Sequence, residues 1–204
     1  MKLQLTKLPG VLIVEPTVFA DERGWFMESF NENRFGSEVE RLGLPRPRRF
    51  VQDNHSCSRA GVLRGLHYQR PPHAQGKLVR VVSGAAFDVA VDLRSESPTF
   101  GLWFGLELTA ENRKQLWIPE GFAHGFLALQ DDTHFLYKTT DYYAASSERS
   151  IRWNDPAIGI VWPGGAFAAP LLADKDLGAP DLATALSAGD LFSRGSDDQA
   201  ARRG

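Results

Sequence analysis

The chain has 204 residues, which fits one domain, because domains usually span ~100–200 residues. Hydrophobic residues make up 43% and charged residues 24%, both ordinary for a globular protein, and the net charge of −2 argues against nucleic acid or membrane as a partner. The single cysteine, Cys57, excludes an internal disulfide framework, and neither a signal-like stretch nor a window of ~20 apolar residues occurs, so we expect a cytoplasmic protein.

Short runs with alternating apolar and polar residues recur along the chain, and turn residues separate them. In the run 87–94, large apolar side chains occupy every second position. Regular spacing of such runs indicates an all-β sandwich or barrel. Helical spacing is confined to 31–42 and to part of 174–186, so we predict only a few short peripheral helices. The predicted strands are 25–30, 50–55, 63–69, 77–82, 87–94, 103–109, 122–129 and 134–139.

Neither an internal repeat nor a linker divides the sequence. We therefore predict one domain over residues 1–188. The remainder, 189–204, ends in a polar and aperiodic stretch, which predicts a flexible C-terminal tail.

His67 is the histidine with the clearest candidate role. It lies on a predicted strand whose same face carries Gly65, which would leave room for a ligand against the ring. Imidazole titrates near neutral pH and can therefore take up and return a proton in the cell. The alternative is a core histidine that is satisfied by a backbone carbonyl.

His124 ends a P-x-G-x-x-H pattern over residues 119–124, which resembles the second motif of the cupin superfamily of double-stranded β-barrels. In metal-binding cupins this histidine is a ligand beside an H-x-H pair and a glutamate. Here 68–69 supply no second histidine after His67, and Lys77 would repel a cation. We therefore expect no bound metal.

Lys77 and Arg64 are cations on strands that should border the same barrel interior. Arginine suits bidentate phosphate recognition, and lysine suits a developing oxyanion. Arg64 and His67 are three residues apart, however, and would point to opposite faces of a regular strand. A bulge at Gly65 would bring both inside. Otherwise Arg64 serves another surface or a neighbouring subunit, and each cation could also be ordinary surface charge.

Tyr137 and Asp176 are two further candidates. Tyr137 shares a strand face with Phe135, so its phenol could donate a proton inside a barrel or simply pack there. Asp176 could orient a histidine, as carboxylates do in catalytic triads, or remain a solvated charge.

Several long strings together resemble one family, that of dTDP-4-dehydrorhamnose 3,5-epimerase, an enzyme of the deoxysugar (L-rhamnose) pathway. The resemblance runs from about residue 8 to residue 176, and only the segment 164–169, which is small and apolar, departs from it clearly. The matching strings are 21–24, 52–56, 62–67, 75–80, 97–101, 118–126 and 137–143.

The resemblance implies a cupin-like jelly roll, a homodimer and a cofactor-independent isomerase. The implied reaction inverts C3 and C5 of dTDP-4-dehydro-6-deoxy-D-glucose to give dTDP-4-dehydro-L-rhamnose. A related enzyme that inverts a single centre, or a ketoisomerase on a related nucleotide sugar, remains an alternative on the same scaffold. A metal-dependent cupin oxygenase and a non-catalytic sugar-nucleotide barrel are alternatives of other classes.

The resemblance also assigns roles. His67 would be the base, with Asp176 as its carboxylate partner, while Lys77 would face the C4 oxygen and Tyr137 would be the acid. The residues that would bind the nucleotide and the sugar are Arg23, Glu28, Gln52, Asn54, Arg64, His124, Tyr143, Glu148 and Lys175.

Overall fold

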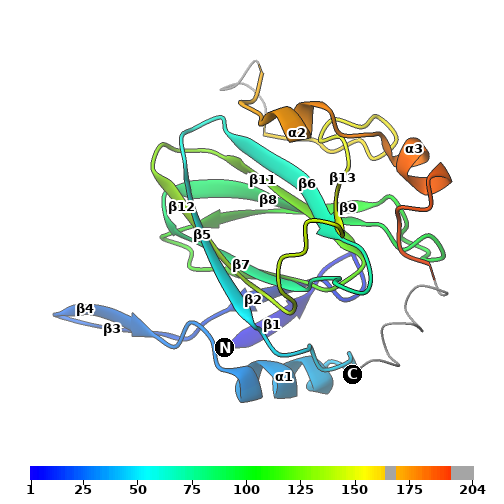
Figure 1. Cartoon of the computed structure of the whole chain (residues 1–204). Helices are drawn as coiled ribbons and strands as arrows, with labels where there is room; N and C mark the ends of the chain where they lie inside the picture. The colour runs from blue at the N-terminus through cyan, green and yellow to red at the C-terminus, as the bar shows by residue number, and fades with distance from the viewer. Residues whose placement is uncertain (164–168, 194–204) are drawn as a thin grey trace.

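The computed structural model describes residues 1–163 and 169–193, and it shows two antiparallel sheets packed face to face (Figure 1). The predicted all-β, cupin-like jelly roll with short peripheral helices is confirmed. The unusual segment at 164–168 and the residues 194–204 of the predicted tail lie outside the described residues. No helix in the described part is long and apolar enough to cross a membrane.

One sheet has six strands and the other has five, and a separate hairpin adds two more. In spatial order the six-stranded sheet contains β1 (Lys2–Leu5), β2 (Leu12–Glu15), β10 (Gln115–Ile118), β7 (Lys77–Ser83), β12 (Thr133–Thr139) and β5 (Gln52–Ser58). The five-stranded sheet contains β13 (Glu148–Ser150), β6 (Leu63–Gln69), β11 (Phe122–Ala128), β8 (Ala85–Asp92) and β9 (Trp103–Thr109).

The main core lies between the two sheets. Alternate residues of each strand point inward, as the pleat requires, and Phe126 stacks on Phe135 across the interior with ring centroids 4.1 Å apart. The apolar residues fill one part of this interior. The rest of the interior holds polar and charged side chains, and the candidate site lies in this polar part.

The outer face of the six-stranded sheet is covered in part by α1 (Glu32–Arg41), which matches the predicted helix 31–42. Asn31 caps the helix by accepting a hydrogen bond from the Arg34 amide, at 3.1 Å. Phe35 packs edge-on against Trp117 of the sheet, with centroids 5.6 Å apart. Phe50, which lies just before β5, packs against both rings, with centroids 6.2 and 5.7 Å away.

The C-terminal segment covers the outer face of the five-stranded sheet. It includes α2 (Asp174–Leu177) and α3 (Leu182–Ser187), which fall within the predicted helical region. Residues 189–193 differ from the predicted tail, because Leu191 and Phe192 are buried against this sheet. Burial of these two apolar side chains accounts for the difference.

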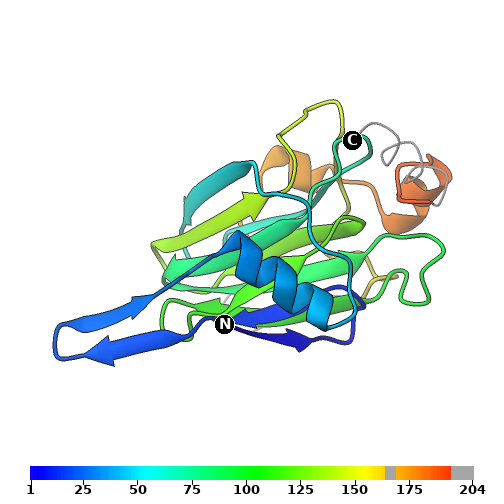
Figure 2. The same ribbon diagram turned by 90° about the horizontal axis from the view of Figure 1, so that it is seen from below.

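A hairpin of β3 (Val18–Asp21) and β4 (Gly24–Met27) projects away from both sheets (Figures 1 and 2). Its aromatic side chains Phe19, Trp25 and Phe26 are all exposed. Exposed aromatic residues grouped in this way are typical of an interaction surface.

Candidate active site

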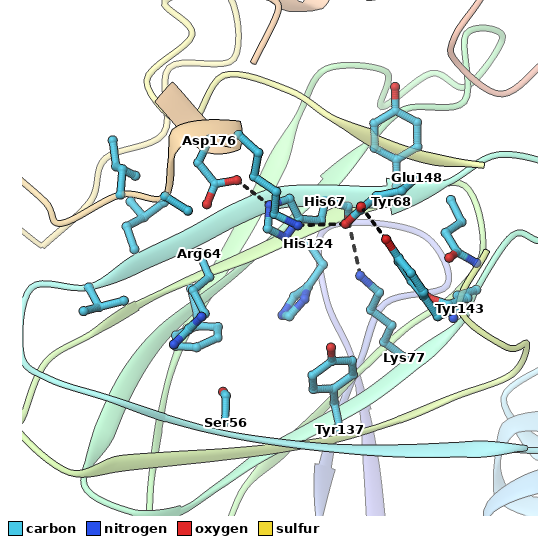
Figure 3. A pocket seen from close by; sticks show the side chains of 18 of the residues that line it. Ser56, Arg64, His67, Tyr68, Lys77, His124, Tyr137, Tyr143, Glu148 and Asp176 are labelled. Atoms are coloured by element: carbon cyan, nitrogen blue, oxygen red, sulfur yellow. Dashed lines mark hydrogen bonds and ion pairs between the residues drawn. The ribbon is translucent and has the colours of Figure 1, made fainter. Parts of the chain in front are cut away.

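A pocket of about 610 Å³ opens at the polar end of the barrel interior. Its walls come from β5, β6, β7, β11, β12 and β13, with α2 at one side. Figure 3 shows His67, Lys77, His124 and Tyr137 reaching toward the same space from different strands. Nine of the thirteen residues predicted for the site line this pocket, and they are His67, Tyr137, Asp176, Lys77, Arg64, His124, Tyr143, Glu148 and Lys175.

A register shift in β6 brings Arg64 and His67 into one pocket. His67 pairs with His124 of β11, whereas Arg64 pairs with Phe126, so β6 uses one residue more than β11 over this stretch. Such a bulge changes which way the following side chains point. The predicted bulge is therefore present, and both side chains line the pocket without a neighbouring subunit.

Gly65 has a different role from the one expected of it. A Cβ atom there would lie 2.5 Å from the Gly125 Cα, and a Cβ on Gly125 would lie 2.8 Å from the Arg64 carbonyl oxygen. The small residue therefore lets β6 approach β11 closely and does not open room for a ligand. Its φ of 140° is also a conformation that favours glycine.

His67 is bonded to Asp176 of α2. The His67 Nε2 lies 2.5 Å from the Asp176 Oδ1, and the Asp176 side chain is 2% exposed. An ionised carboxylate only accepts hydrogen bonds, so Nε2 carries the proton and Nδ1 keeps its free lone pair. The arrangement suits a neutral imidazole that acts as a base. It also answers the question left by the sequence, because Asp176 is not a solvated charge.

Lys77 is the buried cation of the pocket. Its Nζ donates a hydrogen bond to the His67 carbonyl oxygen, at 3.2 Å. Burial lowers the pKa of Lys77 from 10.5 to about 8, against the opposing charges of Asp88 and Glu148. Lys77 therefore remains mostly protonated at neutral pH and can attract negative charge that develops on a bound molecule.

His124 lies opposite His67 and is held from behind. Its Nε2 is 2.7 Å from the Oδ1 of Asp88, which is fully buried on β8. Burial lowers the pKa of His124, more than the carboxylate raises it. His124 is therefore a neutral imidazole at pH 7.

Tyr137 faces the pocket from β12, and burial raises the pKa of its phenol. A phenol with a raised pKa stays protonated at neutral pH, so Tyr137 can donate a proton. Nothing in this geometry requires it to do so, because Tyr137 also packs against Phe135, with centroids 6.4 Å apart.

The rim of the pocket carries a small polar network around Glu148. The carboxylate accepts hydrogen bonds from Lys175 Nζ at 2.8 Å and from the Tyr143 hydroxyl at 3.0 Å. Burial acts to raise the pKa of Glu148, but these two hydrogen bonds outweigh it and lower the pKa. A negative charge on Glu148 thus neutralises Lys175.

Gln52 and Asn54 lie beside the pocket on β5 but do not line it. The Gln52 Oε1 accepts from the Tyr143 amide at 2.9 Å, and the Gln52 Nε2 donates to the Asn54 Oδ1 at 2.9 Å. The Asn54 Nδ2 is buried and has no hydrogen-bond partner in the part of the chain that the structure describes. Gln52 thus supports Tyr143, which lines the pocket.

Arg23 and Glu28 lie outside the pocket of this chain. Arg23 is at the tip of the projecting hairpin, where its Nη2 is 2.5 Å from the Asp21 Oδ2. Glu28 follows the hairpin and forms an ion pair with Arg34, at 3.2 Å. The structure therefore separates these two residues from the other predicted site residues.

Asp88 is the main site residue that the sequence analysis did not single out. On β8 it stands between small and apolar residues, and its alternation resembles that of a solvent-facing polar position. No group of three or more His, Cys, Asp or Glu side chains in the described residues could hold a metal ion. The donors around His67 and His124 form separate histidine–aspartate pairs instead.

The fold and this pocket define a cupin-type isomerase, in which a histidine paired with a carboxylate faces a buried lysine. A family model described as dTDP-4-dehydrorhamnose 3,5-epimerase matches residues 5–184. The chain belongs to the dTDP-4-dehydrorhamnose 3,5-epimerase family.

Close relatives support this membership. The Salmonella typhimurium dTDP-4-dehydrorhamnose 3,5-epimerase is 59% identical over 181 residues, covering 89% of this chain and 95% of the relative. A Legionella pneumophila epimerase, solved in complex with dTDP-4-keto-L-rhamnose, matches with a TM-score of 0.85 and 48% identity, covering 94% and 97% of the two chains. A 3'-monoepimerase from Streptomyces bikiniensis, in complex with dTDP-quinovose, matches with a TM-score of 0.84 and 36% identity over 97% of both chains.

Proposed function

We propose that the protein inverts C3 and C5 of dTDP-4-dehydro-6-deoxy-D-glucose to give dTDP-4-dehydro-L-rhamnose, with His67 as the base. The observation that carries the proposal is the short contact between His67 Nε2 and the buried Asp176, at 2.5 Å. It holds the ring and leaves Nδ1 free to take a proton. The relatives named above act on or bind sugars of this class.

The chemistry follows from the ketone at C4, which acidifies the hydrogens on C3 and C5. His67 removes one of these protons, the C–H electron pair forms a C=C bond, and the carbonyl electrons move onto the C4 oxygen. Lys77 stabilises this enolate more than the neutral ketone, which lowers the barrier. When the enolate collapses, Tyr137 returns a proton to the opposite face of the carbon, and the centre is inverted. His67 then releases its proton to solvent, and solvent reprotonates the Tyr137 phenolate.

The nucleotide would bind at the mouth of the pocket. Among the described residues, Arg64 donates to two neutral groups, Ser58 Oγ at 3.1 Å and the Cys57 carbonyl at 3.4 Å, so its charge is available to a phosphate. Lys175 is adjacent, and Tyr143 offers an exposed ring on which a base could stack.

We further propose a homodimer in the cytoplasm. Arg23 and Glu28 lie away from their own pocket, and they belong to a hairpin and its continuation that project with exposed aromatic residues. A partner pocket would give both residues a role in binding. We expect no cofactor, no membrane association and no nucleic-acid partner.

The test of the base is hydrogen exchange. His67→Ala should abolish deuterium incorporation from D₂O at C3 and C5 while dTDP affinity changes little, because a general base contributes roughly 10²–10⁴ in rate. His55→Ala is the matched control, since His55 lies outside the pocket and contacts His134. Normal exchange in His67→Ala would remove His67 from the mechanism.

Tyr137→Phe tests the acid separately. We expect it to retain some exchange but to slow net inversion, because deprotonation survives while protonation of the opposite face does not. A variant with full epimerase activity would exclude Tyr137.

Inversion of a single centre is the alternative, because a 3'-monoepimerase has the same fold. Identity of 59% to a 3,5-epimerase favours double inversion. Proton NMR of the product distinguishes the two, because inversion at C3 and inversion at C5 each change the coupling constants of the ring protons.

Mixed subunits test the dimer. Arg23→Ala and His67→Ala chains, each defective alone, should regain activity when mixed, because one site of the mixed dimer would combine an intact His67 with an intact Arg23. No recovery after verified subunit exchange would place Arg23 outside the partner's pocket.

A further inference from the structure

Asp190 lies just after α3 and accepts hydrogen bonds from two arginines. Its Oδ1 is 2.6 Å from the Arg70 Nη1 and 2.9 Å from the Arg149 Nε. Its backbone carbonyl oxygen accepts a third hydrogen bond, from the Tyr68 hydroxyl at 3.2 Å. Hydrogen bonds between charged groups are shorter and stronger than neutral ones. They connect the C-terminal segment to β6, to the residue that follows β6, and to β13.

The two strands that Asp190 contacts also carry pocket residues. Tyr68 of β6 lies opposite Arg149 of β13, so both contacts come from one point of the ladder. Successive side chains of a strand point to opposite faces, and Glu148 therefore lines the pocket while Arg149 reaches the C-terminal segment. The strand β13 is thus held by the pocket network on one face and by Asp190 on the other.

The strand β13 has few other contacts to hold it at the Glu148 end. It is a three-residue edge strand, so it pairs along one side only, and all three residues are half-buried. The opposite end is anchored, because the next residue, Ile151, is fully buried and exchanges hydrogen bonds with Leu66 at 2.9 and 3.1 Å. At the Glu148 end, the Arg149 guanidinium bonds both to Asp190 and to the Glu148 carbonyl oxygen, the latter at 2.8 Å.

Glu148 is the residue through which this contact reaches the pocket. Its carboxylate accepts from Lys175 and from Tyr143, and both of these side chains line the pocket. The proposed function assigns both to the nucleotide. Movement of the Glu148 end of β13 would therefore displace the cation and the aromatic ring that the nucleotide meets.

We infer that Asp190 is a positioning residue that, through Arg149, fixes Glu148 at the rim where the nucleotide binds. Asp190 does not line the pocket itself, so it acts through β13. The segment after α3 is then part of the support of the site. This inference rests on the proposed function, because that function places the nucleotide at this rim.

Asp190→Asn is the direct test, because it keeps the backbone contact with Tyr68 and removes the charge that holds the two arginines. We expect dTDP to bind about two- to fivefold more weakly, the size typical of losing a partly exposed ion-pair network. The kcat should stay within about twofold of wild type, because the bonds of His67 and Lys77 do not involve Asp190. Calorimetry with dTDP and turnover at saturating substrate measure the two quantities. Unchanged dTDP affinity would overturn the inference.

A double-mutant cycle with Glu148→Gln tests the route of the effect. If Asp190 acts through Glu148, the double variant should bind dTDP no more weakly than the weaker-binding single variant. Losses that simply multiply would show that Asp190 acts by another route, and would overturn the inference. Should Asp190→Asn not fold, Arg149→Gln breaks the same contact from the side of β13 and should give the same result.

Asp181→Asn is the matched control for loosening of the C-terminal segment. Asp181 caps α3 by accepting from the Thr184 amide at 2.8 Å, and in the described part of the chain it forms no ion pair with β6 or β13. Its substitution should lower stability slightly and leave dTDP affinity unchanged. An equal loss of dTDP affinity in this variant would contradict a specific role of Asp190.

Binding of dTDP needs no turnover, so this inference and the proposed reaction can fail separately. A wild-type protein that exchanges no hydrogen at C3 or C5 refutes the proposed reaction, while weaker dTDP binding by Asp190→Asn would still support the inference. A wild-type protein that does exchange, together with unchanged dTDP binding by Asp190→Asn, refutes the inference alone. A wild-type protein that binds no dTDP refutes both.

Discussion

Strand β8 carries two fully buried carboxylates, and their surroundings differ. Asp92, at the end of the strand, accepts hydrogen bonds from the Arg94 side chain at 2.7 and 2.9 Å, from the Arg94 amide at 3.0 Å, and from Ser97 and Thr99 at 2.7 Å each. Asp88 makes one hydrogen bond, to the neutral His124. Burial is the same for both, but only Asp92 is satisfied by its neighbours.

This difference teaches how to assign a buried charge. Burial acts to raise the pKa of Asp92, but the bonds from Arg94, Thr99 and Ser97 outweigh it and lower the pKa, so the charged form supports the loop that follows the strand. Asp88 instead contacts His124, which lines the pocket. We therefore expect substitutions near Asp92 to affect stability and substitutions near Asp88 to affect catalysis.

The largest expected effect is that of Lys77→Met, which should separate activity from stability. Loss of the ammonium should reduce kcat/KM by about 10²–10³. A fall in pKa from 10.5 to about 8 means that burying this cation costs up to about 3 kcal/mol of unfolding free energy at neutral pH, so the variant should be more stable than the wild type. Urea denaturation at pH 7, with product NMR, measures both quantities.

The pH dependence provides a check on this prediction. Between about pH 8 and 10.5, unfolded Lys77 binds more protons than folded Lys77, so wild-type stability rises with pH in this window. The advantage of Lys77→Met should therefore shrink across it. A variant that is less stable than the wild type at pH 7 would contradict the assignment of Lys77 as a costly buried charge.

Asp92→Ala should show the opposite pattern. Removing the carboxylate leaves Arg94, Ser97 and Thr99 without their common acceptor, and we expect a loss of about 3 kcal/mol in the free energy of unfolding. The kcat/KM of the folded fraction should remain within about twofold of wild type, because Asp92 does not line the pocket. A large loss of kcat/KM in fully folded protein would break the comparison between the two carboxylates.

The wild-type enzyme should lose activity above about pH 8, roughly tenfold for each further pH unit, while it stays folded. Lys77 must be protonated to stabilise the enolate, so the limb follows its titration. The stabilisation that Asp92 provides depends on pH in the opposite direction. Because folding lowers the pKa of Asp92, this stabilisation is fully present above the pKa of the unfolded chain, and it is lost as the pH falls through the pKa of the folded protein. Circular dichroism at each pH distinguishes the two effects, and an activity profile that is flat to pH 10 would contradict the first.

Glu148→Gln should have the smallest effect. Its ion pair with Lys175 is partly exposed, and such pairs contribute about 0–1 kcal/mol. We expect little change in the free energy of unfolding and a change of only a few fold in KM as the rim network loosens. A loss of several kcal/mol would show that this rim carboxylate supports the fold in the way that Asp92 does.

Much of the barrel could be predicted from local patterns. The strands at 63–69 and 103–109 have the predicted bounds, and the helix at 31–42 differs only at its caps. The short strands β1, β2, β3, β10 and β13 were missed, because none is longer than four residues and every residue of β10 is buried, so that they give little or no alternation. Alternation indicates a strand only when one face meets water.

The site was predicted less evenly, for a related reason. Motif and strand parity identified His67 and Lys77, but a single strand does not show whether its polar face points to water or into a closed barrel. Asp88 was missed for this reason, since only pairing with β11 places it behind His124. The position of Arg64 likewise depends on a register shift between two strands, which is a property of the pair and not of either sequence alone.

The contact between Gly65 and Gly125 has a consequence for anyone who redesigns this enzyme. Two backbones touch there, so even a methyl group at either position would push the strands apart and displace His67 with them. Substitutions at Gly65 or Gly125 are therefore not a way to change which hexose the site accepts. Libraries aimed at new sugars should vary residues 171–173, whose side chains line the cavity.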